Sequence, residues 1–136
     1  MPRNKTNTNI KNLVRAARNA RARAYAPYSK FLVGAALLGQ SGKVFSGCNV
    51  ENLSFGLTMC AERVCVGSAI AGGEENLEAI AIVAESHKPI LPCGACRQVL
   101  AEFNPRLVIY SATPDGPMSE FRLNDLLPMP RQGIME

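Results

Sequence analysis

Three cysteines in two short motifs constrain the possible folds of this chain most strongly. The motif CAE contains Cys60, and the motif PCGAC contains Cys93, 33 positions later, and Cys96. Each motif opens a segment with the apolar spacing of a helix, residues 60–73 and 93–103. If the three thiols form one site, the fold must place the N-termini of two helices side by side.

The position of these cysteines favours metal binding. Unpaired N–H groups and the helix dipole at a helix N-terminus stabilise a thiolate, which is the form that binds metal. Cys93 and Cys96 are three positions apart and therefore share one helix face. Three thiolates without an obvious fourth protein ligand predict a tetrahedral zinc site with one open position, as in catalytic zinc sites. We expect one zinc ion per chain, held by Cys60, Cys93 and Cys96.

The other potential ligands fit different roles. Cys65 lies among apolar residues of the first predicted helix and Cys48 lies in a predicted strand, which favours core packing for both. The single histidine, His87, lies in a polar turn, where we expect surface exposure. A thioredoxin-like redox pair is the alternative interpretation of PCGAC, but it needs no third cysteine.

Glu62, two positions after Cys60, is the predicted catalytic residue. Zinc deaminases have a two-part sequence signature, in which a metal ligand is followed two positions later by Glu, and the motif PCxxC comes further along the chain. CAE and PCGAC match the three-cysteine form of this signature. Hydrolytic deamination moves protons from water to a ring nitrogen and to the departing ammonia, and one carboxylate beside the metal can carry them. In isolation, Glu62 would be interpreted as a solvated glutamate at a helix start.

Three thiolates around Zn²⁺ leave a net negative charge, which weakens the metal as a Lewis acid. Arg63 follows Glu62 directly and could donate hydrogen bonds to the cysteine sulfurs, supporting the site from outside the ligand set. The alternative for Arg63 is a plain exposed arginine.

Length and composition indicate a single globular domain over residues 1–136. The chain is 47% hydrophobic and 19% charged, and it contains no apolar run of the roughly 20 residues that a membrane span requires. Its polar beginning lacks the apolar core of a secretory signal, so we expect a cytoplasmic protein. In that reducing compartment the five cysteines are expected to be free, catalytic or metal-bound.

The net charge of +4 does not by itself indicate a nucleic-acid partner. The basic residues before position 24 alternate with apolar residues at helical spacing over residues 9–25, so they occupy the outer face of one predicted helix. We interpret this as a solvated face and expect no nucleic-acid partner. An RNA contact is the alternative.

The remaining elements alternate between strands and helices. Two β-rich runs flank the turn QSG and predict a hairpin, and three further strands and a short helical turn at 124–128 follow. The five predicted strands are residues 31–39, 43–50, 77–85, 107–113 and 119–123. Helices interleaved with such strands predict a three-layer α/β/α sandwich with a mixed five-stranded sheet.

The chain resembles the small, homotetrameric, three-cysteine cytidine deaminases over almost its whole length. The motifs that carry the resemblance are AYAPYSKFLVGAAL, GCNVEN, GLTMCAER, PCGACRQVL and DLLP, in the same order and with similar spacing. The resemblance implies hydrolysis of cytidine and 2′-deoxycytidine to the uridines and ammonia, in pyrimidine salvage. It also implies a cytidine deaminase fold and a homotetramer with sites at subunit interfaces.

Substrate-binding residues follow from the same resemblance. It implies that Phe31 lines the nucleoside pocket, that Asn49 and Glu51 bind the ribose hydroxyl, and that the backbone of Ala61 and Cys93 faces the base. The residues themselves support the ribose contact. Asn49 and Glu51 are two positions apart at the end of a predicted strand and therefore share a face. An amide and a carboxylate together can hydrogen-bond a polyol, and the negative carboxylate repels phosphate. The alternatives are turn-capping polar groups for the pair and a core position for Phe31.

One position departs from the family pattern. A phenylalanine usually stands three residues after LLP and stacks on the base in a neighbouring subunit's site, whereas this chain has Arg131 there. The guanidinium could stack in its place, the flanking prolines could turn the tail away, or the end of the chain could be frayed.

Two other functions remain as alternatives. One is deamination of a different pyrimidine nucleoside or of a base within RNA, although 6% aromatic residues argue against a strand-binding groove. The other is a zinc-stabilised module without catalytic activity.

Overall fold

Five strands form one mixed sheet in the computed structural model, which describes residues 2–131, with side chains from residue 8 onward. The strands are β1 (Val33–Gly39), β2 (Val44–Cys48), β3 (Leu77–Ala84), β4 (Val108–Ala112) and β5 (Met118–Arg122). Their order across the sheet is β2-β1-β3-β4-β5. β3 and β4 are parallel, and the other neighbouring pairs are antiparallel, including the predicted hairpin of β1 and β2.

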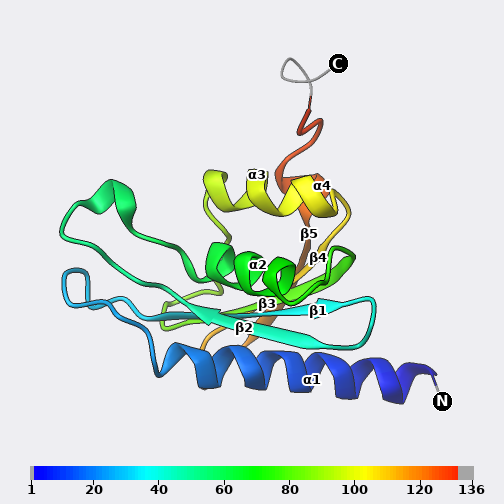
Figure 1. Ribbon diagram of the computed structural model, residues 1–136. Coiled ribbons are helices and arrows are strands. Elements are labelled where there is room, and N and C mark those ends of the chain that lie inside the picture. The colour runs from blue at the N-terminus through cyan, green and yellow to red at the C-terminus, as the bar shows by residue number, and fades with distance from the viewer. Residues whose placement is uncertain (1, 132–136) are drawn as a thin grey trace.

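Helices cover both faces of this sheet (Figure 1). One face carries α1 (Pro2–Arg21), and the other carries α2 (Ala61–Ala71), α3 (Gly94–Phe103) and the short α4 (Leu123–Leu126). The central strand β3 is buried at seven of its eight residues, as expected for a strand covered on both sides. These three layers confirm the predicted α/β/α sandwich and its mixed five-stranded sheet.

Alternate side chains of β3 supply the two halves of the core. Ile80 and Ile82 pack with Leu100 of α3 in the cluster beneath α2 and α3. Ala81 and Val83 belong to the cluster beneath α1. Because a strand directs successive side chains to opposite faces, this one apolar run fills both interlayer spaces.

α1 differs in its bounds from the predicted helix over residues 9–25. It begins earlier, and it ends at Arg21. Tyr25 instead forms an isolated bridge with Val50, and its backbone N–H donates to the carbonyl of Asn49 at 3.0 Å. Pairing with this distant segment replaces the last predicted turn, which the local apolar spacing could not indicate.

Gly34 allows α1 to approach the sheet closely. A Cβ atom at Gly34 would lie 2.0 Å from the carbonyl oxygen of Ala17, so no larger residue fits without a backbone shift. Beside this contact, the Arg21 Nε donates to the carbonyl of Leu32 at 3.2 Å. The end of α1 therefore anchors the segment that leads into β1.

Four segments meet at one end of the sheet. The N-termini of α2 and α3 lie there, and the loops spanning residues 22–32 and 49–60 extend from the same end (Figure 1). The second loop contains a short 3-10 helix, η1 (Phe55–Leu57), which the sequence patterns did not predict. Among the described residues, no helix combines the length and apolar character needed to cross a membrane.

Candidate active site and metal centre

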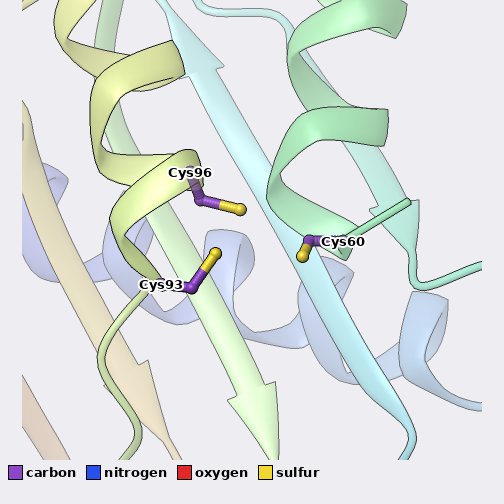
Figure 2. A group of neighbouring side chains, drawn as sticks. All are labelled: Cys60, Cys93 and Cys96. Atoms are coloured by element: carbon purple, nitrogen blue, oxygen red, sulfur yellow. The ribbon is translucent and has the colours of Figure 1, made fainter. Parts of the chain in front are cut away.

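The three predicted zinc ligands come together where α2 and α3 begin. Cys60 and Cys93 are the N-cap residues of α2 and α3, and Cys96 lies in the first turn of α3. Their sulfur atoms all lie within 4.8 Å of one another and point into a shared space (Figure 2). Neither N-cap residue uses its side chain to cap its helix, so both sulfurs are available to this shared centre.

The donor set fits one zinc ion. Sulfurs bound to a tetrahedral zinc at about 2.3 Å lie roughly 3.8 Å apart, so the observed spread of at most 4.8 Å requires only small adjustments. Within residues 2–131, no fourth cysteine, histidine or carboxylate joins this group. The cluster could therefore hold one zinc ion with a position left open for water or substrate.

Arg63 contacts this cluster from α2. Its Nη2 atom donates to the sulfur of Cys60 at 3.4 Å and to the carbonyl of Thr58 at 3.3 Å. The pKa of Cys60 is lowered to about 5, mainly by its hydrogen bond with Cys96, and the hydrogen bond and charge of Arg63 act in the same direction. Interaction with Cys60, together with burial, raises the pKa of Cys96. Arg63 thus favours the thiolate form of Cys60 before any metal binds.

Glu62 lies in the first turn of α2 and is almost fully buried, with 5% of its surface exposed. Burial, reinforced by the negative charge of Cys60, raises its pKa to about 7. A carboxyl group that titrates near neutrality can both accept and donate a proton, which is what general acid–base catalysis requires. The fold thus puts a carboxyl group suited to proton transfer directly beside the thiol cluster.

A cavity of about 280 Å³ opens next to the cluster. Its lining includes all the predicted substrate-binding residues together with Glu62 and two of the thiols: Phe31, Asn49, Glu51, Cys60, Ala61, Glu62 and Cys93. Five further residues complete the lining: Ser29, Val33, Thr58, Ile90 and Leu91. Cys96 and Arg63 are not part of this lining. Mostly apolar walls with a few convergent polar groups are typical of small-molecule sites.

Asn49 fixes one wall of the cavity. Its Oδ1 accepts a hydrogen bond from the Val33 N–H at 2.9 Å, and its Nδ2 donates to the carbonyl of Phe31 at 2.8 Å. Both bonds hold the backbone on either side of Leu32, so this amide orients the segment that carries the aromatic ring. The second N–H of Nδ2 remains for a further acceptor.

Glu51 is held from the facing loop. Its Oε1 accepts hydrogen bonds from the backbone N–H groups of Tyr28 at 3.0 Å and Ser29 at 3.1 Å, and its Oε2 accepts one from the Ser29 hydroxyl. These bonds, the hydroxyl foremost, lower the pKa of Glu51. The carboxylate therefore stays ionised at neutral pH and can accept hydrogen bonds from a polyol.

The other cysteines and the histidine lie outside the cluster. Cys65 is completely buried in the core, which confirms its predicted packing role, and burial raises its pKa. Cys48 is half-buried at the end of β2. His87 is exposed in the loop after β3, as expected.

Comparison with known proteins decides the family. The model of the cytidine and deoxycytidylate deaminase zinc-binding region matches residues 7–112. The chain belongs to this family. Among curated members, a cytidine deaminase of Sporosarcina psychrophila is 43% identical over 120 residues, which make up 88% of each chain. One from Halalkalibacterium halodurans is 47% identical over 117 residues, 85% of this chain and 89% of the relative.

Solved structures of cytidine deaminases share the fold as well. The enzyme of Burkholderia pseudomallei superposes with a TM-score of 0.84 at 51% identity, covering 87% of this chain and 95% of the other. The enzyme of Mycobacterium tuberculosis superposes with a TM-score of 0.76 at 46% identity, covering 87% of this chain and 93% of the other. The sequence resemblance to this deaminase family is confirmed.

Several cavity residues of this deaminase family member were not predicted from its sequence. Ser29 stands in the family-like stretch AYAPYSKFLVGAAL, two positions before Phe31, where its proximity to a predicted pocket residue was the available signal. Ile90 and Leu91 precede PCGAC directly, but nothing in their pattern distinguishes pocket from core. The hydroxyl of Ser111 in β4 donates to the carbonyl of Ile90 at 2.5 Å and fixes this part of the wall.

Proposed function

We propose that this chain is a zinc-dependent hydrolase that converts cytidine and 2′-deoxycytidine to uridine and 2′-deoxyuridine with release of ammonia, in pyrimidine salvage. The observation that carries the proposal is the buried Glu62, with a pKa near 7, between a three-thiol cluster and a cavity of nucleoside size. The curated relatives named cytidine deaminase support the substrate.

The three cysteines and Glu62 would have different roles in the deamination reaction. Zinc held by Cys60, Cys93 and Cys96 would supply a Lewis acid that brings the pKa of water close to neutrality. Glu62 accepts a proton from the attacking water and delivers it to the ring nitrogen beside the attacked carbon. It then takes the remaining proton of the former water from the hydroxyl on the attacked carbon and transfers it to the amino group, the C–N bond breaks, and ammonia leaves. The water oxygen becomes the new carbonyl oxygen of uridine.

The opposite end of the cavity suits a sugar. The ionised Glu51 and the free N–H of Asn49 offer an acceptor and a donor to ribose hydroxyls, and Phe31 offers an aromatic wall. Backbone groups of Ala61 and Cys93 would face the base. A carboxylate at the sugar end repels phosphate, which supports a free nucleoside over a nucleotide or a nucleic acid as substrate.

Activity on free cytidine tests the proposal most directly. Zinc-loaded protein should convert cytidine to uridine, followed by the loss of ultraviolet absorbance of the cytosine ring and by ammonia release. A different pyrimidine nucleoside and a cytidine-containing RNA, assayed in parallel, address the competing deaminase functions. Stable zinc binding without turnover of any of these substrates would support a non-catalytic zinc module instead.

Glu51→Gln should weaken binding of the nucleoside more than binding of the free base. The amide keeps the shape of the carboxylate but loses its charge and one acceptor, so KM for cytidine should rise about tenfold. KM for cytosine should change little, because the free base has no ribose to hold. Equal effects on both substrates would show that the substitution disturbs the fold or that Glu51 has another role.

We also propose a homotetramer with the sites at subunit interfaces. Large apolar side chains stand exposed on the loop beside the cavity, with Leu53 78%, Phe55 73% and Leu57 68% exposed. The ring of Phe55 packs edge-on against Tyr28 at 6.0 Å, which joins this loop to the one that holds Glu51. Exposed apolar groups gathered at one place favour an interface. Light scattering should give about four times the 14.6 kDa chain mass.

We further propose that residues 1–136 form one catalytic domain that works in the cytoplasm. The single sheet with its two helical layers supports one domain. All five cysteines are free in the structure, three of them in a cluster that must remain reduced to bind metal, which supports a reducing compartment.

Arg131→Ala should leave KM for cytidine, zinc content and oligomer mass unchanged. The Nη2 of Arg131 lies 3.9 Å from a carboxylate oxygen of Glu102, and the neighbouring Pro130 carbonyl accepts a hydrogen bond from Gln98 at 3.3 Å. These contacts hold the tail along α3 of its own chain, and an exposed ion pair of this kind contributes at most about 1 kcal/mol. A several-fold rise in KM would show that the guanidinium stacks on the base, and dissociation to monomers would show a role in assembly.

A further inference from the structure

The hydroxyl of Ser29 joins the two sides of the sugar end of the cavity. It donates to Oε2 of Glu51 and accepts a hydrogen bond from the backbone N–H of Phe31 at 3.0 Å. The backbone N–H of Ser29 donates to Oε1 of the same glutamate at 3.1 Å. One residue therefore contacts both the carboxylate and the segment that carries the aromatic wall.

The backbone conformation of this loop depends on the same contacts. Lys30, between Ser29 and Phe31, has a φ of 62°, a left-handed conformation that non-glycine residues seldom adopt. This conformation returns the Phe31 N–H toward the serine hydroxyl, as in turns closed by a serine side chain. Strained backbone at a binding site persists only where surrounding contacts hold it.

Glu51 has few other restraints. It lies beyond the end of β2, and the two ion pairs found among the described residues, Arg21–Glu85 and Arg131–Glu102, do not involve it. Its carboxylate accepts hydrogen bonds only from residues 28 and 29 in the described part of the chain. A glutamate without such restraint samples several rotamers, and fixing it would reduce the free energy gained on binding a ligand.

We propose that Ser29 is a positioning residue for the sugar of the substrate. Its hydroxyl holds the Glu51 carboxylate and the Phe31 backbone in the arrangement that accepts a ribose, so that Ser29 sets the preference for substrates with sugar hydroxyls. The proposal rests on the proposed nucleoside deaminase function, and it assigns Ser29 an effect on substrate affinity that acts through Glu51.

The hairpin turn between β1 and β2 contains the same arrangement away from the cavity. The backbone N–H and the hydroxyl of Ser41 donate to Oε1 of Glu74, and the Lys43 N–H donates to the Ser41 hydroxyl at 3.3 Å. Neither Ser41 nor Glu74 lines the cavity. Ser41→Ala therefore removes the same pair of hydrogen bonds as Ser29→Ala and serves as a matched control for their structural contribution.

The test compares Ser29→Ala, Ser29→Thr and Ser41→Ala holoenzymes with cytidine and with 2′,3′-dideoxycytidine, which lacks the 2′- and 3′-hydroxyls of the sugar and keeps the 5′-hydroxyl. Ser29→Ala should raise KM for cytidine about tenfold, as expected for a weakened hydrogen bond to a charged group, with kcat within about twofold. KM for the dideoxy substrate should change less than about twofold. Threonine keeps the hydroxyl and should restore KM, and Ser41→Ala should behave as the unaltered protein.

Equal KM increases for both substrates, or the same kinetic change in Ser41→Ala, would overturn the proposal and show a structural role. Calorimetric titration with cytidine, using Glu62→Gln protein to prevent turnover, provides a measurement that does not depend on activity. There Ser29→Ala should weaken binding about tenfold, and an unchanged affinity would overturn the proposal. Cytidine binding without turnover by the unaltered holoenzyme would reject the deaminase function alone.

Discussion

Glu62→Gln should lower kcat for cytidine at least about 100-fold while the protein keeps its zinc. Glutamine has the size of glutamate and can fill the same buried space in the first turn of α2, but it cannot take up and release protons. Burial raises the pKa of Glu62 to about 7, the range in which a carboxyl group can both accept and donate protons at neutral pH. The measurement is steady-state kcat together with zinc content by mass spectrometry.

Glu74→Gln is the matched control for this substitution. Glu74 is also buried, with 9% exposed, but its carboxylate is bound to the Ser41 turn and does not line the cavity. Its replacement should lower thermal stability through lost hydrogen bonds and leave kcat close to that of the unaltered protein. Near-normal turnover by Glu62→Gln protein would remove Glu62 from the mechanism, and loss of zinc would show that the substitution disturbs the cluster.

The sequence patterns predicted the elements that carry strong periodicity. The apolar run of β3 and the cysteine-headed segments of α2 and α3 have the composition and spacing of a buried strand and of two helices, and the structure contains all three. The clustering of the three cysteines could also be predicted from the sequence. Ligand motifs at the N-termini of two helices can share one metal ion only if those two N-termini lie side by side. The end of α1 was not predicted correctly. The helix ends at Arg21 and not at residue 25, because Tyr25 pairs with the distant Val50.

The contacts that shape the proposed sugar end of the cavity were not predictable in the same way. Ser29 and Glu51 are 22 positions apart, and their hydrogen bond depends on how two irregular loops fold against each other. Loop residues have no periodicity, and a serine in a turn has many possible partners. The family resemblance pointed to Glu51 as a ligand contact, whereas only the structure shows which groups hold its carboxylate.

Cys93→Ala and Cys96→Ala should each reduce bound zinc from about one ion per chain to nearly none, with loss of deaminase activity. Each substitution leaves only two thiols of the three-sulfur group, and two ligands hold zinc far more weakly than three. The two variants differ in burial, because Cys93 is exposed and Cys96 is buried. Cys96→Ala should therefore also lower the melting temperature of the metal-free protein, whereas Cys93→Ala should not.

Cys65→Ala separates zinc loss from general damage to the core. Cys65 is completely buried in α2 but does not belong to the sulfur cluster, so its replacement should lower the melting temperature and keep zinc. Zinc content by mass spectrometry and thermal melting with and without a chelator give both quantities for every variant. Added chelator should destabilise the unaltered protein and Cys65→Ala protein, because metal bound only to the folded state stabilises that state. It should leave Cys93→Ala and Cys96→Ala unchanged. Full zinc occupancy in both of these variants would contradict the ligand set and return PCGAC to the redox interpretation.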